Sequence, residues 1–410
     1  MARSNTARNG ARSAAREAAS EVLHAYATAP RTAVPETVRP ADPGPAILAA
    51  LVADAARPAR GDPASLALSA WLRHVGRGFW HPGVFGGGGL AGCFVGAHIA
   101  SHTWPELGRL STWLRSRQVE HAGSGPWARH EVSWADYDVI TGPSGIVLAL
   151  ACDPACPPSC VTPLVAHLTA LCDSDGLGRL RVGAYRDEPL RGWNHGRINT
   201  GLAHGATGVV AALRAAGELA GPNEALTSAA RRVAGWLTAE SFTDARGVLT
   251  WACAGADGRA SPAGASPRQA WCYGTPGIAW TLWEVGRVLG DPGLRSLALG
   301  ACASFLAAYD DTVYLDAAPY EGTTSLDSLG FCHGAAGLLL LADAFDRHAN
   351  VPGAAELRDH LEHHLLDHLG EVLEFSETDP SLLSGACGVV AALLTLHTGD
   401  RRWLPCVALR

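Results

Sequence analysis

A short glycine motif that recurs along the chain limits the fold more than any other feature. Its successive copies begin 53, 63, 69, 60 and 51 residues apart. An apolar run usually follows the motif, and a stretch that mixes charged residues with Leu and Val comes next. This spacing fits one helical hairpin per interval, so the sequence predicts a helical repeat protein. The first glycines of the six Gly-x-x-Gly turns are Gly89, Gly142, Gly205, Gly274, Gly334 and Gly385.

The two kinds of helix in each interval predict two layers. A helix that is apolar on nearly every side must be buried all round, so the runs at 209–213, 278–282, 338–341 and 389–393 predict inner helices. The stretches at 105–122, 223–239 and 354–369 read as outer helices. We therefore expect an all-α fold, an α/α toroid that forms a double-layered barrel of six or seven hairpins. The toroid should occupy residues 44–410, after an N-terminal tail and lead-in helix at residues 1–43.

Composition excludes several classes of protein. Of the 410 residues, 48% are hydrophobic and 17% are charged, and the net charge of -7 gives no basic footprint for nucleic acid. No apolar stretch is long enough to span a bilayer, and the arginine-containing N-terminus lacks the core of a secretory signal. Eleven cysteines without such a signal indicate free thiols, and we expect a cytoplasmic protein.

Two of the glycine turns have the form Cys-x-Gly-x-x-Gly. Cys272 and Cys332 each stand two residues before the first glycine, and His333 follows Cys332. Equivalent positions in one repeat fold can face a common centre, so these three residues predict one zinc ion per chain with one coordination position open. The alternative is that two small buried cysteines and a satisfied histidine pack a tight turn.

Other polar residues stand at the same turns. His204 and Tyr273 directly precede first glycines, and Asp138 lies just upstream of Gly142. Two long interruptions, 174–200 and 241–268, are expected to form a substrate-binding rim, the second with short β-like pieces. The acidic segment 310–327 could form a lip of the mouth, although a solvated connector explains it better.

Two further clusters are weaker candidates for metal binding. Cys152, Cys156 and Cys160 share a proline-rich segment whose spacing matches no common zinc knuckle. A group of histidines lies among charged residues on an expected outer helix, which indicates a solvated face. These histidines are His360, His363, His364 and His368.

Four segments together resemble the lanthionine synthetase C-like family, which contains the cyclases of lanthipeptide biosynthesis. They are 137–145, 199–205, 268–277 and 332–334, in family order. The resemblance covers the chain from about residue 80 to the C-terminus. It implies an α/α toroid with zinc held by Cys272, Cys332 and His333. It also places His204, Asp138, Arg268 and Tyr273 on active-site positions of the family.

Family members cyclise a precursor peptide whose Ser and Thr residues a separate dehydratase has already dehydrated. The resemblance implies that a substrate Cys thiolate adds to dehydroalanine or dehydrobutyrine. We expect His204 to do acid–base work with Asp138 orienting it, while Arg268 stabilises enolate charge and Tyr273 positions the substrate. Each residue also has a structural alternative: packing for His204 and Tyr273, helix capping for Asp138, and ion pairing for Arg268.

Three other functions compete with a cyclase. A zinc-dependent prenyltransferase-like toroid would need a basic cluster for a diphosphate, and Arg268 alone supplies little. A glycosidase toroid needs two opposed carboxylates, and only Asp138 stands at a motif. A non-catalytic, zinc-containing peptide-binding toroid would call for four protein ligands, of which the sequence offers three. The expected partners are a dehydrated precursor peptide, a separate dehydratase and a biosynthetic complex with which the protein associates peripherally.

Overall fold

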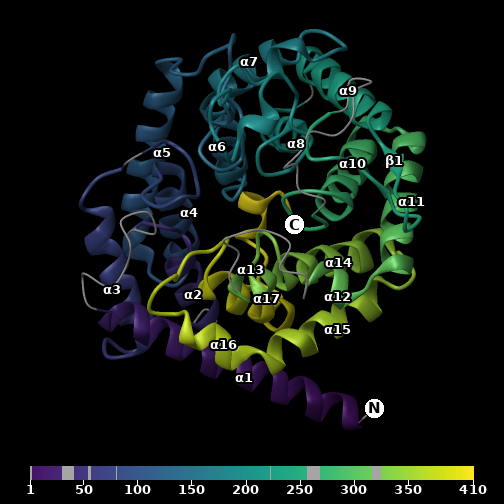
Figure 1. The fold of residues 1–410 in the computed structure, drawn as a ribbon. Coiled ribbons are helices and arrows are strands. Elements are labelled where there is room, and N and C mark those ends of the chain that lie inside the picture. The colour runs from purple at the N-terminus through teal and green to yellow at the C-terminus, as the bar shows by residue number, and fades with distance from the viewer. Residues whose placement is uncertain are drawn as a thin grey trace.

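The fold is a closed ring of helices in two concentric layers (Figure 1). The structure is a computed structural model, and it describes residues 2–29, 41–53, 57–79, 81–221, 223–255, 268–315 and 325–410. Within these residues, seven inner helices each contact the next, and the last contacts the first. The inner helices are α2 (Gly44–Ala53), α4 (Leu90–Ser101), α6 (Pro143–Leu150), α8 (Ala206–Ala220), α10 (Thr275–Leu289), α14 (Ala335–Ala349) and α17 (Ala386–Thr398).

Each inner helix packs against one outer helix. The outer helices are α3 (Pro63–Val75), α5 (Gly108–Gly123), α7 (Thr162–Leu171), α9 (Glu224–Ala239), α11 (Pro292–Ala308), α15 (Ala354–Asp367) and α1 (Ala2–Thr28). Helix α1 contacts both α17 and α3, so the N-terminal segment supplies the outer helix of the last hairpin. It is helical from Ala2 onward, where the sequence suggested a frayed tail before a helix.

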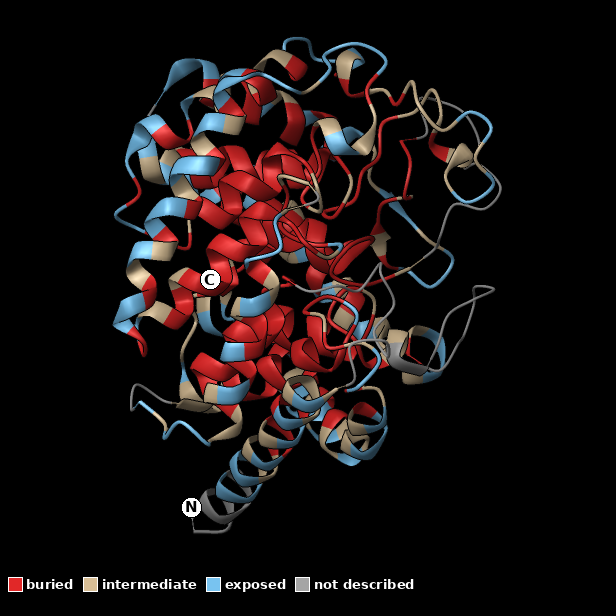
Figure 2. Cartoon of the chain, turned by 90° about the vertical axis from the view of Figure 1, so that its left-hand side faces the viewer, coloured by how far each residue is buried: buried red, intermediate tan, exposed pale blue. Residues whose placement is uncertain are grey.

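The inner and outer helices differ in burial as expected. The first eight residues of α2 and the first twelve of α10 are all buried, whereas α9 and α15 bury one face only. Figure 2 shows the buried residues gathered in the inner helices, with exposed residues on the outer ones. The prediction of an α/α toroid is therefore confirmed, with seven hairpins, the first of which lies before Gly89.

Short elements fill the connections between hairpins. Helices α12 (Asp311–Tyr314), α13 (Ser325–Leu329) and α16 (Leu369–Glu374) lie in the later connections, and 3₁₀ turns lie in the earlier ones and near the C-terminus. The strands β1 (Phe242–Thr243) and β2 (Leu249–Thr250) form a small antiparallel hairpin inside the expected rim segment 241–268. The 3₁₀ turns are η2 (Pro105–Leu107), η3 (Trp134–Asp136), η4 (Pro158–Cys160), η5 (Gly178–Leu180), η6 (Gly192–Asn194) and η7 (Leu404–Val407).

A circle of backbone hydrogen bonds links the glycine turns at one mouth of the ring, and we refer to it as the belt. From the Gly142 turn onward, the carbonyl two residues before the first glycine accepts an N–H from the preceding turn. The bonds are Val84 to Ile140 (3.0 Å), Val139 to Ala203 (2.9 Å), Leu202 to Cys272 (2.8 Å), Cys272 to Cys332 (3.3 Å) and Cys332 to Leu383 (2.8 Å). The belt therefore places equivalent residues of successive repeats side by side.

Asp42 completes the belt where the first hairpin has no glycine turn. Its Oδ1 accepts the N–H of Leu382 at 2.8 Å and that of Gly44 at 2.9 Å. Its carbonyl accepts the indole N–H of Trp71 at 2.9 Å. One buried side chain thus joins the last turn to the first inner helix.

The second glycine of each turn allows this close packing. A methyl group built there would lie between 1.8 and 2.4 Å from a carbonyl oxygen of the same turn. At Gly388 the oxygen is that of Leu382, which is also the last donor of the belt. Only a residue without a side chain fits such an approach.

The C-terminal residues enter the ring, and the C-terminus lies near its centre (Figure 1). The carbonyls of Val407 and Ala408 accept the indole N–H groups of Trp271 and Trp280 at 2.8 and 3.1 Å. Arg410 pairs with the buried Glu284 at 3.0 Å, far along α10 from the glycine turn. The tail therefore fills the ring from the end opposite the belt. No helix in the described part of the chain combines the length and hydrophobicity needed to cross a bilayer.

We expect Gly388→Ala to destabilise the fold strongly, because the new methyl group would collide with the Leu382 carbonyl. Overpacking of this kind costs about 1–3 kcal/mol or more in unfolding free energy. Gly300→Ala is a matched control, because this exposed position in α11 has no atom within 4 Å of an added methyl group. It should stabilise the protein by about 0.5–1 kcal/mol. Chemical denaturation of both variants measures the difference, and equal effects would contradict the packing argument.

The buried Asp42 should make stability depend on pH. Burial raises the pKa of Asp42 from 3.8 to about 7, although the N–H groups of Gly44 and Leu382 oppose the shift. Between about pH 4 and 7 the unfolded chain loses this proton while the folded chain keeps it, so stability falls as pH rises. We expect the unfolding free energy of Asp42→Asn, relative to that of wild type, to increase by about 1.4 kcal/mol for each pH unit across this window. Urea denaturation at several pH values measures the difference, and a constant one would contradict this account.

Candidate active site

Two successive turns of the belt bring together the expected metal ligands. Cys272 precedes α10, while Cys332 and His333 precede α14. One donor atom from each residue lies within 4.8 Å of the other two, and no other such group of three occurs among the described residues. Cys272 is 1% exposed and Cys332 is 9% exposed, so the sulfur atoms lie at the inner edge of the mouth.

His333 is oriented by a carboxylate. Its Nδ1 lies 3.0 Å from Asp327 Oδ1, on α13, and this leaves Nε2 as the nitrogen available to a metal. Burial opposes protonation of His333, but the adjacent Cys272 and the bond to Asp327 raise its pKa to about 9. The same bond lowers the pKa of Asp327. Histidine ligands of zinc commonly donate their second ring N–H to a carboxylate in this way.

The donor set fits a zinc ion. Burial, reinforced by the neighbouring Cys332, raises the pKa of Cys272 well above its ordinary value. The Cys272 thiol therefore stays protonated unless a cation compensates the charge of its thiolate. Two sulfurs and one imidazole nitrogen suit zinc, and three protein ligands are typical of zinc sites that keep a position for substrate.

His204 and Asp138 form an ion pair on the adjacent turns. His204 Nδ1 lies 2.7 Å from Asp138 Oδ2, and Asp138 is 1% exposed. The other oxygen of Asp138 accepts the N–H groups of Thr141 and Gly142, both at 2.8 Å. The carboxylate thus makes both contacts considered from the sequence, since one oxygen caps its turn and the other contacts the histidine. His204 Nε2 remains the only ring nitrogen not engaged by Asp138.

Tyr273 is buried at the edge of the site. Its hydroxyl oxygen accepts the amide N–H of Asn199 at 2.9 Å, and its ring packs so closely on Gly201 that a methyl group there would lie 2.5 Å from it. Burial raises the pKa of Tyr273, so the hydroxyl stays protonated. Because the oxygen accepts one bond, its hydrogen can serve a second partner.

Arg268 lies close to the metal ligands. Its positive charge contributes to lowering the pKa of both Asp327 and His333. Its carbonyl oxygen packs against Gly274, whose φ of 77° belongs to the region that favours glycine. The structure therefore brings all seven sequence-identified residues to one mouth of the ring.

Three residues around these groups were not assigned a role from the sequence. Asp327 orients His333, Asn199 binds Tyr273, and the indole of Trp134 stacks on His204 with centroids 4.2 Å apart and planes 20° apart. Asp327 was grouped with an acidic lip, of which Asp316 and Glu321 lie outside the described residues. Asn199 opens one of the matching motifs, whereas the sequence around Trp134 carries no comparable signal.

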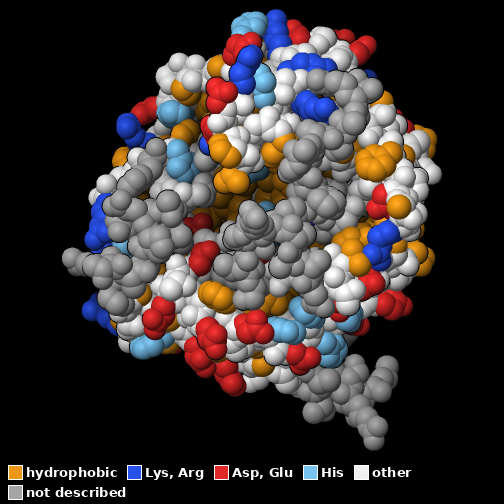
Figure 3. Space-filling view, viewed as in Figure 1, with side chains coloured by type: hydrophobic (Ala, Val, Ile, Leu, Met, Phe, Trp, Pro, Cys, Tyr) orange, Lys and Arg blue, Asp and Glu red, His pale blue; other side chains and the backbone are white. Residues whose placement is uncertain are grey.

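The mouth opens onto a hollow in the molecular surface. Figure 3 shows this hollow at the centre of the ring, with hydrophobic side chains at its floor and acidic side chains along one rim. The expected rim segment 174–200 is folded, and its residue Val182 forms a β-bridge with Val132. Residues 256–267 of the second segment lie outside the described residues.

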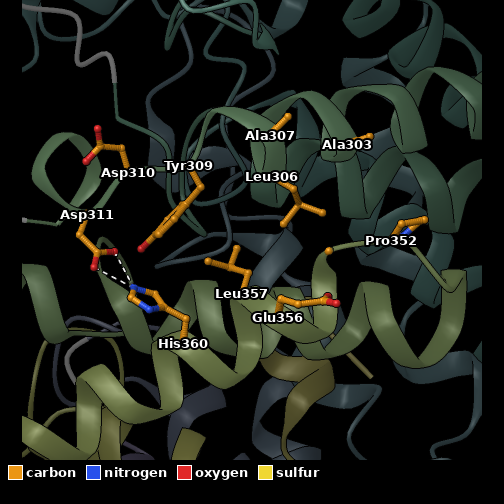
Figure 4. Close-up of a pocket in the computed structure, with 11 residues that line it drawn as sticks. Ala303, Leu306, Ala307, Tyr309, Asp310, Asp311, Pro352, Glu356, Leu357 and His360 are labelled. Atoms are coloured by element: carbon orange, nitrogen blue, oxygen red, sulfur yellow. Dashed lines mark hydrogen bonds and ion pairs between the residues drawn. The ribbon is translucent and has the colours of Figure 1, made fainter.

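The weaker metal candidates lie elsewhere. Cys152, Cys156 and Cys160 are buried, and Cys152 donates to the carbonyls of Leu148 and Trp403, both at 3.8 Å. His360 is on the outer helix α15, where it pairs with Asp311 at 2.7 Å. Figure 4 shows both at one end of an outer surface groove of about 700 Å³ between α11 and α15. Neither group forms a metal-binding cluster within the described residues.

Comparisons with known proteins agree with this architecture. A solved structure of the nisin cyclase superposes with a TM-score of 0.70 at 20% sequence identity, over 89% of this chain and 91% of that one. At this identity the likeness shows the fold. A search of curated protein sequences found no match. The family model described as lanthionine synthetase C-like protein matches residues 43–409. The chain therefore belongs to the lanthionine synthetase C-like family and is a lanthionine cyclase, an enzyme that forms thioether bonds.

Proposed function

We propose that this enzyme is a zinc-dependent lanthipeptide cyclase acting on a dehydrated precursor peptide. The observation that carries the proposal is the three-donor group of Cys272, Cys332 and His333 on turns adjacent to the His204–Asp138 pair. Bound there, a zinc ion would lower the pKa of a substrate cysteine, because thiols that coordinate zinc are deprotonated. Asp327 supports this site by holding His333 with Nε2 toward the cysteines.

The reaction conserves atoms and charge. The thiol gives up its proton and its sulfur bonds to the β-carbon of dehydroalanine or dehydrobutyrine. The π electrons of the alkene move toward the α-carbon and its carbonyl, and the α-carbon then gains a proton. One proton is lost and one is gained, so a single acid–base group can serve both steps.

His204 is suited to this proton transfer. Asp138 holds Nδ1 and stabilises the charged imidazole, which leaves Nε2 to exchange protons with the substrate. Arg268 offers positive charge near the metal ligands, where negative charge develops on the substrate carbonyl. Tyr273 can donate its hydroxyl hydrogen to the peptide, since Asn199 occupies the oxygen. These roles extend the geometry and form part of the proposal.

The proposal includes a cellular setting. All eleven cysteines lie within the described residues and none forms a disulfide, which agrees with a reducing cytoplasm. The substrate would arrive already dehydrated from a separate dehydratase, because the addition of a thiolate requires an alkene, and the acid–base pair and the thiol-binding site serve that addition. A purely peptide-binding role would call for a fourth protein ligand, and the group contains three.

We expect Cys272→Ala to abolish zinc binding and thiol consumption together, because the remaining two ligands cannot hold the ion. Elemental mass spectrometry should find one zinc per wild-type chain and none in the variant. The thiol assay should use a dehydrated peptide that contains cysteine. Cys302→Ala, on the outer helix α11, is the control and should keep both zinc and activity. Zinc retained by Cys272→Ala, or absent from wild type, would refute the proposed centre.

We expect His204→Gln to lower kcat by about 10²–10⁴-fold, the range for loss of a general acid or base. Asp138→Asn keeps an oxygen to cap its turn, so it should fold and lose activity to a smaller extent. Both variants should retain zinc, because neither residue belongs to the donor group. His360→Gln on the outer wall serves as the control. Wild-type kcat in His204→Gln would remove this residue from the mechanism.

A further inference from the structure

Trp134 contacts the candidate acid–base pair in two independent ways. Its indole lies almost parallel to the imidazole of His204, with ring centroids 4.2 Å apart. Its carbonyl oxygen accepts the N–H groups of Tyr137 at 3.0 Å and Asp138 at 2.8 Å. One residue therefore supports the backbone of the carboxylate and the ring of the histidine.

The stacking supplies a restraint that the hydrogen bond lacks. The bond from His204 Nδ1 to Asp138 fixes one ring atom, but the imidazole can still tilt about that point. A flat indole face at van der Waals distance fixes the plane of the ring and hence the direction of Nε2. An aromatic face also favours the charged imidazole that forms when His204 holds a proton.

Trp134 is itself held by the rim. It lies in η3, where Ser133 and Asp136 form a capping box with bonds of 2.8 Å. Its backbone N–H donates to the hydroxyl oxygen of Tyr185 at 3.1 Å, and the two rings meet edge to face at 5.2 Å. The rim segment 174–200 thus reaches the histidine through this indole.

The backbone of Tyr185, the residue of this rim segment whose side chain contacts Trp134, is strained. Tyr185 has a φ of 69°, which costs free energy for a residue other than glycine and persists where its surroundings fix it. The guanidinium of Arg191 covers the Tyr185 ring at 4.3 Å, and its Nε donates to Glu188 at 2.6 Å. Trp193 adds a third aromatic ring, 6.2 Å from Trp134.

We propose that Trp134 is the positioning residue of the cyclase: its indole fixes the plane of His204 so that Nε2 delivers the proton to one face of the substrate α-carbon. This inference rests on the proposed function, in which His204 is the proton donor. The imidazole N–H bond breaks, its electrons stay on nitrogen, and the proton forms the C–H bond. When the imidazole can tilt, solvent protonates the α-carbon from either side. Loss of the indole therefore reduces both the rate and the stereochemical purity of the thioether product.

The test compares Trp134→Leu with Trp134→Phe, which keeps an aromatic face. Trp134→Leu should lower kcat at least about tenfold with little change in KM, since misplacing a catalytic group slows the chemical step. It should also produce a second diastereomer, detected by chiral chromatography of the hydrolysed product. Trp134→Phe should recover most of the rate and the purity. Trp113→Leu, which removes a half-exposed tryptophan from α5, should match wild type.

A spectroscopic readout tests the contact without turnover. Histidine labelled with ¹³C at Cε1 should give a His204 signal shifted upfield by the indole ring current, and the signal is assigned by its loss in His204→Gln. That shift should disappear in Trp134→Leu, while the zinc content and the thermal unfolding midpoint stay at wild-type values. If Trp134→Leu does not fold, Trp134→Met serves in its place, because the backbone bonds of residue 134 do not depend on the side chain.

Three results would overturn the inference. They are an unchanged kcat and diastereomer ratio in Trp134→Leu, a change in KM alone, and a His204 signal that does not move. Failure of the proposed function would look different. His204→Gln would then cyclise the peptide normally, while the protein with His204 in place would still show the ring-current shift. If His204→Gln loses cyclase activity while Trp134→Leu keeps the wild-type rate and diastereomer ratio, only the positioning role of Trp134 is refuted.

Discussion

The belt of backbone hydrogen bonds is the constraint on which the rest of the structure depends. From the second glycine turn onward, it joins the carbonyl two residues before the first glycine to an N–H of the preceding turn, as in the bond from the Cys272 N–H to the Cys332 carbonyl. Side chains at that position consequently face the same mouth in successive repeats. The two sulfur atoms of the proposed metal site are neighbours because Cys272 and Cys332 occupy equivalent places in adjacent hairpins, and His333 follows by one residue. The proposed site is thus a local change of residue type on a repeated backbone.

The glycine turns also explain why buried polar groups are tolerated at the mouth. A ring of inner helices leaves unpaired N–H groups at every helix start. Carbonyls of the turns satisfy several of them, such as that of Asn199 for Ala206 and that of Asp379 for Ala386. Asp42 and Asp138 each accept two backbone N–H groups through one oxygen. At Asp138 the second oxygen is left for His204. The candidate acid–base pair therefore uses a carboxylate that also caps its turn. At Asp42, burial of a similarly placed carboxyl group raises its pKa.

The features that follow from the repeat could be predicted from the sequence. Period and apolar runs indicated the inner helices and the toroid, and the matched turns indicated Cys272 and Cys332. Residues whose importance comes from contacts between loops were missed. Asp327 reaches His333 from α13, and Trp134 reaches His204 from a 3₁₀ turn, and neither recurs with the glycine period. Helix α1 was underestimated for a related reason, since the partners of its buried Ala15, Ala19 and Leu23 lie at both ends of the chain.

Two kinds of backbone therefore meet at the mouth, and they contribute differently to the chemistry. The belt supplies ligands and the acid–base pair from short turns fixed by hydrogen bonds and close glycine packing. The loops supply residues that orient those groups, such as Asp327 for His333 and Trp134 for His204. Loops tolerate changes in length and sequence better than the turns, because fewer buried contacts depend on them. Within one toroid, the chemistry can thus stay constant while the loops adjust how the reacting groups are held and which peptide reaches them.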